Sequence, residues 1–198
     1  EHRANRDRRY KLAGEFRDRR WHSVVECNGI DELRELSTKY QSVLVGSDQL
    51  WQPDIAFTNF YTLRFAAPGV KRISYATSLG VSEYPKYCWK QAKDYWTQID
   101  YISVREEQGA NLIEKIAGIK PEVVADPTYL LKKEEWLELI PDKTIFEGRY
   151  VLCYFLSDDK DAKELAIKYA HDRGFKCIGI LSSECNADDS DLDEVLTD

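Results

Sequence analysis

The side chains of this sequence that are best suited to chemistry follow short apolar runs. They combine hydroxyl, amide, carboxylate and guanidinium groups, which together can bind sugars, carboxylates or phosphates. Their positions are Ser47, Asp48, Gln49, Ser78, Arg105, Glu106 and Asp126. The runs that precede them cover residues 43–45, 73–76, 101–104 and 123–125. Each polar cluster therefore stands where a strand is expected to end.

Arg105 stands between an apolar run and a segment of helical period. The amino terminus of a helix would add free N–H donors to its guanidinium group, and the two together suit a carboxylate or a phosphate. The alternative is a structural ion pair with Glu106, Glu107 or Asp126. On spacing alone the ion pair is the stronger interpretation, because charge networks are often structural.

The segment 46–51 places a glycine, a hydroxyl, a carboxylate, an amide and an indole close together. Asp48 and Gln49 can bind sugar hydroxyls, and Trp51 can stack on the apolar face of a sugar ring. That interpretation requires Trp51 to be partly exposed. A tight turn with Trp51 buried in the core explains the segment equally well.

Several other chemistries have no support in the sequence. No His or Cys cluster has the spacing of a metal site, and neither G-x-G-x-x-G nor a Walker loop is present. The G-x-S-x-G elbow of hydrolases is also missing. We therefore expect no metal and no cofactor, and disfavour nicotinamide dehydrogenases and P-loop kinases.

Segments of helical period alternate with the apolar runs. Apolar positions recur at helical spacing over residues 30–36, 88–99 and 112–117, and Gly118 is a suitable helix end. Short, non-alternating runs rich in Val and Ile are typical of parallel strands buried on both faces. The pattern predicts an α/β fold with a Rossmann-like parallel sheet.

A second unit is expected to begin near Arg149. A strand over 150–156, a helix over 162–170 and a strand over 175–181 would form one β-α-β unit, with Gly174 ending the helix. We therefore predict an N-terminal Rossmann-like domain over 1–148 and the start of a second, incomplete one over 149–198.

Composition limits the partners of the protein. With 43% hydrophobic and 12% aromatic residues in 198, the chain is typical of soluble globular proteins. No apolar stretch approaches the ~18 residues of a membrane span. The basic residues of segment 1–20 are interleaved with acidic ones, as on a solvated helix, so nucleic acid is not an expected partner. Five cysteines without a C-x-x-C pair favour a reducing cytoplasm.

Four motifs together resemble the polysaccharide pyruvyltransferase family. They are VGSDQLW at 45–51, SYATSLG at 74–80, ISVRE at 102–106 and DPT at 126–128, the last followed by Trp136. Their order and approximate spacing match over roughly residues 33 to 181. The resemblance implies transfer of a pyruvyl group from phosphoenolpyruvate to a sugar of a surface polysaccharide or its precursor, forming a ketal.

The resemblance also implies an architecture and roles for single residues. Two Rossmann-like domains would face a cleft, as in GT-B-type glycosyltransferases. A first strand would precede Glu1, and donor-binding motifs would follow Leu181, so the chain is expected to be a fragment that is inactive alone. Arg105 would bind the donor anion, and Asp48 would act as base or orient the acceptor. Further substrate contacts are expected from Ser47, Gln49, Trp51, Tyr75, Ser78 and Glu106.

Two other functions stay open at this point. One is a GT-B-type glycosyltransferase with a nucleotide-sugar donor, and the other is a non-catalytic carbohydrate-binding relative. Nucleotide release would indicate the first, and binding without turnover the second. The implied acceptor is a sugar on a nucleotide or lipid carrier, so peripheral association with a membrane is a further expectation.

Overall fold

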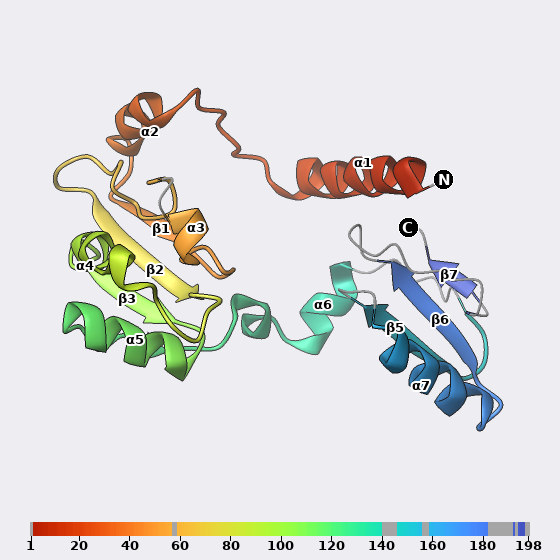
Figure 1. Ribbon diagram of the computed structural model, residues 1–198. Helices are drawn as coiled ribbons and strands as arrows, with labels where there is room; N and C mark the ends of the chain where they lie inside the picture. The colour runs from red at the N-terminus through yellow and green to blue at the C-terminus, as the bar shows by residue number, and fades with distance from the viewer. Residues whose placement is uncertain are drawn as a thin grey trace. The chain divides into compact units, whose positions relative to one another are not determined.

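The computed structural model describes residues 2–56, 59–139, 146–155, 159–181, 192 and 194–196. The chain divides into two compact units. One is Val25–Pro141, and the other combines Glu1–Val24 with Asp142–Asp198. Figure 1 shows the elements of both units.

A parallel four-stranded sheet forms the centre of the unit Val25–Pro141. Its strands are β1 (Ser42–Val45), β2 (Lys71–Thr77), β3 (Tyr101–Val104) and β4 (Glu122–Val123), which neighbour one another in this order. The prediction of four parallel strands in one sheet is confirmed. β4 ends earlier than predicted, because Asp126 and Pro127 begin a 3-10 helix shortly after it.

Helices precede, connect and follow these strands, as the alternating pattern predicts. They are α2 (Ile30–Ser37), α3 (Pro53–Ala56), η1 (Lys86–Cys88), α4 (Trp89–Trp96), α5 (Glu107–Ala117), η2 (Pro127–Leu130) and α6 (Lys133–Leu139). Gly118 ends α5 with a left-handed conformation at φ 75°, which a glycine adopts without steric cost. The expected helix end is confirmed. The unit is an α/β fold of Rossmann-like type.

The core of this unit lies between the sheet and the adjacent helices α4 and α5 (Figure 1). The most deeply buried large side chains include Trp51, Tyr95, Trp96, Val104 and Ile113. On the sheet itself, Leu44 and Tyr101 remain 63% and 57% exposed. Since α5 begins three residues after β3 ends, packing of α5 on the core also fixes the loop between them.

The second unit also has a parallel sheet. It contains α1 (His2–Arg20), β5 (Tyr150–Phe155), α7 (Lys160–His171), β6 (Lys176–Leu181) and β7 (Glu194–Leu196), with strand order β5-β6-β7. The predicted β-α-β unit is confirmed, although Leu156, expected to end the first strand, lies outside the described residues. The carboxylate of Asp159 caps α7 by accepting from the N–H of Ala162 at 3.0 Å.

No helix in the described ranges has the length and apolar character that a membrane span requires. The division into domains at 148/149 and the GT-B-type arrangement stay predictions.

Candidate functional site

The loop after β1 runs close against the end of β2. A Cβ atom on Gly46 would overlap the carbonyl oxygen of Tyr75, so this approach requires glycine. Beyond it, the N–H of Ser78 donates to the carbonyl of Asp48 at 3.0 Å, and the N–H of Trp51 donates to the carbonyl of Ser78 at 3.2 Å. These bonds bring both loops together at the carboxyl edge of the sheet, where ligands bind in open α/β folds.

A hydrogen-bond network joins three loops at this edge. Nη1 of Arg105 donates to Oδ2 of Asp126 at 3.1 Å and to the carbonyl oxygen of Ser47 at 3.0 Å. The hydroxyl of Ser47 donates to the same Oδ2 at 3.0 Å. These contacts bring together the loops after β1, β3 and β4, each of which carries one of the polar clusters that were expected to follow a strand.

Arg105 lies between two carboxylates and is still open to solvent. Its Nε donates to Oε1 of Glu106 at 3.0 Å, while its side chain is 30% exposed. Within the described part of the chain, Nη2 has no hydrogen-bond partner. Burial lowers the pKa of Arg105, but hydrogen bonds and charges from Glu106 and Asp126 raise it above its ordinary value. Arg105 therefore keeps its positive charge.

This geometry bears on both interpretations of Arg105. The structural alternative foresaw an ion pair, and Arg105 pairs with Glu106 and Asp126. The guanidinium group is not sealed between them, because almost a third of the side chain is exposed. Its role toward the donor stays a prediction that the ion pairs do not contradict.

Thr128 fixes the orientation of the Asp126 carboxylate. Its N–H and its hydroxyl donate to Oδ1 of Asp126 at 2.9 and 2.8 Å. These two bonds are the main cause that lowers the pKa of Asp126 from 3.8 to about 2, and the bonds from Ser47 and Arg105 add to the effect, against a smaller rise from partial burial. Asp126 is therefore ionised throughout the physiological pH range.

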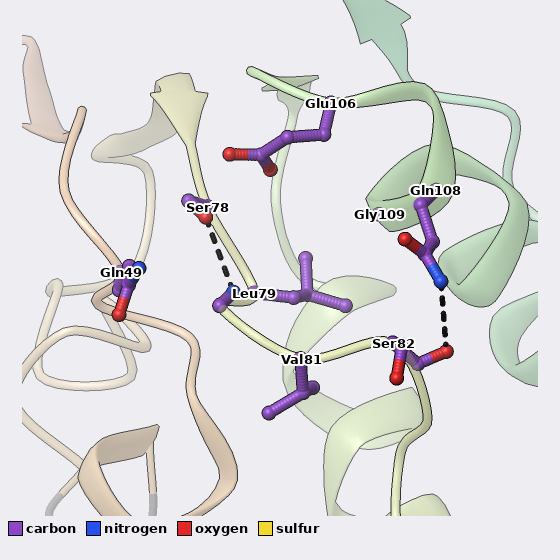
Figure 2. A pocket seen from close by; sticks show the side chains of 9 residues that line it. Gln49, Ser78, Leu79, Val81, Ser82, Glu106, Gln108 and Gly109 are labelled. Atoms are coloured by element: carbon purple, nitrogen blue, oxygen red, sulfur yellow. Dashed lines mark hydrogen bonds between the residues drawn. The ribbon is translucent and has the colours of Figure 1, made fainter. Parts of the chain in front are cut away.

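An open pocket of about 290 Å³ lies beside this network, and Figure 2 shows the side chains around it. Its walls are formed by Gln49, Ser78, Leu79, Gly80, Val81, Ser82, Glu106, Gln108 and Gly109. The structure thus brings together three predicted site residues from three loops, Gln49, Ser78 and Glu106. Glu106 belongs to both the pocket and the hydrogen-bond network, since it lines the pocket and accepts a hydrogen bond from Arg105.

Gln108 was not foreseen as a site residue. It lies in the first turn of α5 and donates from Nε2 to the carbonyl of Ser82 at 3.2 Å (Figure 2). A helix that starts directly after a strand places its first turn at the carboxyl edge of the sheet. A polar residue three positions after Arg105 could therefore have been predicted as a site residue.

Asp48 forms a turn beside the pocket. Its Oδ1 accepts from the N–H of Gln49 at 2.7 Å, and its carbonyl accepts from Leu50 and Ser78. The side chain is exposed and is not among the pocket walls. The catalytic role of Asp48 stays a prediction.

Trp51 differs from its prediction. The side chain has no exposed surface, and its Nε1 donates to the carbonyl of Tyr61 at 3.1 Å. Its ring packs against Tyr95 and Trp96 of α4, with centroid distances of 6.0 and 6.3 Å. The expectation of an exposed Trp51 is wrong, because the turn at Asp48 directs the indole into the core. Trp51 is a core residue that anchors the loop.

The side chain of Tyr75 lines a different hollow from the one that Gln49, Ser78 and Glu106 line. It is half-buried and lines a separate hollow of about 370 Å³ over the sheet, together with Tyr101 and Glu122. The structure therefore does not bring Tyr75 to the pocket of Gln49 and Glu106.

The described ranges contain no preformed metal site. No group of three or more His, Cys, Asp or Glu side chains there is arranged to hold an ion.

The chain matches the family model of polysaccharide pyruvyl transferases over residues 2–190, nearly its whole length. No curated protein and no solved structure gives a match. The matched range contains the whole first sheet, the Arg105–Asp126 network and the pocket. On this match, the chain belongs to the polysaccharide pyruvyl transferase family.

Proposed function

We propose that this protein contributes to transfer of a pyruvyl group from phosphoenolpyruvate to two hydroxyls of a sugar. One hydroxyl adds to C2 of the donor while C3 gains a proton and becomes a methyl group. The second hydroxyl then replaces phosphate at C2, which gives a cyclic ketal and inorganic phosphate. Of the two hydroxyl protons, one balances the methyl group and the other leaves with phosphate.

The observation that carries this proposal is the partly exposed cation at the carboxyl end of β3. Arg105 keeps its charge and has Nη2 without a partner in the described residues, beside an open pocket. The donor carries a carboxylate and a phosphate, and guanidinium groups bind both well. A cation at this point would also stabilise the charge that develops on the leaving phosphate.

The pocket supports an acceptor that is rich in hydroxyls. Its polar walls include the amides of Gln49 and Gln108 and the carboxylate of Glu106. Its volume of about 290 Å³ lies near the lower end of the ~300–1,000 Å³ typical of small-molecule sites. We assign the orientation of the acceptor, or the removal of its proton, to Asp48, whose exposed carboxylate lies one residue before Gln49.

The setting that fits this reaction is the cytoplasm, because the donor is a cytoplasmic metabolite. The described cysteines form no disulfide, which agrees with a reducing compartment. An acceptor on a lipid carrier would bring the protein to the membrane surface.

The direct test supplies the full-length protein with phosphoenolpyruvate and a panel of sugar nucleotides and lipid-linked sugars. We expect inorganic phosphate and product in equal amounts, with a ketal methyl signal in the NMR spectrum of the product. A parallel reaction with sugar nucleotides alone is the control. Release of nucleotide in this control, together with no release of phosphate in the reaction that contains phosphoenolpyruvate, would replace the proposal with glycosyl transfer.

A further inference from the structure

We infer that Asp126 is a positioning residue, which holds Arg105 in the orientation that binds the anionic donor. This inference rests on the proposed function. Asp126 lies in the loop after β4, and its carboxylate accepts four hydrogen bonds. Oδ1 takes the two from Thr128, and Oδ2 takes one each from Ser47 and Arg105.

The four bonds divide between two tasks. The two bonds from Thr128 fix the plane of the carboxylate, because one comes from the main chain at the start of η2. The other oxygen is then aimed at Ser47 and Arg105, which lie 79 and 21 residues away in the sequence. Asp126 thereby ties three separate loops to one point.

The effect on Arg105 follows from the planarity of its guanidinium group. Three acceptors fix that plane, Oε1 of Glu106, the carbonyl of Ser47 and Oδ2 of Asp126. They engage Nε and Nη1 and leave Nη2 with one fixed direction. A group held in its binding orientation before the ligand arrives loses less freedom on binding, so the donor binds better.

Charge and orientation predict opposite results for the loss of Asp126. The donor is anionic, so removing a neighbouring negative charge would by itself improve donor binding. Loss of the positioning contact would weaken it. Asp126→Asn separates the two effects, because it removes the charge and places an amide of nearly equal size at the same position.

The experiment measures steady-state kinetics of the full-length protein with phosphoenolpyruvate for four forms, wild type, Asp126→Asn, Arg105→Lys and the double variant. We expect Asp126→Asn to lower kcat/KM for the donor about 10–100-fold, with the acceptor KM unchanged. The double variant should be no more than about threefold worse than Arg105→Lys, since residues that act through each other are not additive. Multiplying losses, or a lower donor KM in Asp126→Asn, would overturn the positioning role.

Failure of the proposed function gives a different pattern. If Arg105→Lys leaves donor kinetics unchanged, the donor role of Arg105 fails, whatever Asp126→Asn does. Should Asp126→Asn fail to fold, Thr128→Val is the second variant, because it removes only the hydroxyl that donates to Oδ1. We expect a loss in donor kcat/KM of about two- to fivefold from it, and unchanged donor kinetics in the folded variant would overturn the inference.

Discussion

Arg72 and Arg105 serve the same sheet at its opposite ends. Arg72 lies near the amino end of β2, and its guanidinium group donates to the carbonyls of Leu63 and Ala66, both at 3.0 Å, and of Gln98 at 3.5 Å. Arg105 follows the carboxyl end of β3 and bonds to two carboxylates and one carbonyl. Both groups are half-buried, so exposure does not distinguish them.

The difference lies in which nitrogens are used. All three guanidinium nitrogens of Arg72 bind main-chain carbonyls, which holds the chain before β2 to the loop after α4. Arg105 has Nη2 without a partner in the described residues, and a pocket adjoins its neighbour Glu106. The described contacts of Arg72 thus use all three of its guanidinium nitrogens, while the described contacts of Arg105 leave unpaired the one nitrogen that the proposed donor role requires.

The largest effect on stability is expected below the edge of the sheet, at Trp51. Trp51→Ala would leave a cavity among Tyr95 and Trp96 and lower the free energy of unfolding by about 3–5 kcal/mol. Chemical denaturation of the full-length protein measures this value. Trp21→Ala is the matched control, because Trp21 is 64% exposed and its loss should cost no more than about 0.5 kcal/mol. Equal losses in the two variants would contradict a core role for Trp51.

A smaller loss of stability is expected at the amino end of the sheet. Arg72→Ala would leave the carbonyl of Ala66, a buried residue, without its donor, and would remove one of the two donors to the carbonyl of Leu63. We expect the free energy of unfolding to fall by about 2–4 kcal/mol. The donor kcat/KM of the folded protein should not change. A kinetic defect at unchanged stability would erase the distinction between the two arginines.

The next prediction concerns the donor kinetics of a variant at Arg105, at the carboxyl end of the sheet. Arg105→Lys keeps the charge but loses the planar fork, so we expect donor kcat/KM to fall by about one to two decades, equivalent to about 1.5–3 kcal/mol. The acceptor KM and the Tm should change little. A lower Tm with equal losses for donor and acceptor would make Arg105 a structural residue like Arg72.

The sequence predicted positions along strands better than directions of side chains. Apolar runs and helical spacing located the four strands and the helix end at Gly118, because burial and backbone freedom depend on local residue types. They also placed Arg105 and Asp126 at one edge, since parallel strands share it. The sequence left the burial of Trp51 open as one of two interpretations, because the rings that pack against it lie in α4, about 40 residues later in the chain. The role of Thr128 in fixing Asp126 depends on the geometry of a single local turn, which residue types alone do not determine.

The smallest effect follows from proton binding at Asp126. Its pKa is lowered from 3.8 to about 2 in the folded protein, first by the hydrogen bonds from Thr128. A lowered pKa means that the ionised carboxylate stabilises the fold, fully above about pH 4, and that this contribution is lost as the pH falls through about 2. The described acceptors of the Arg72 guanidinium are main-chain carbonyls, which do not titrate, whereas those of the Arg105 guanidinium include the carboxylate of Asp126. Unfolding measured between pH 4 and 2 should show a steeper loss of stability for the wild type than for Asp126→Asn, with Thr128→Val between them. Parallel curves for all three proteins would show that the Asp126 network does not stabilise the folded chain through its charge.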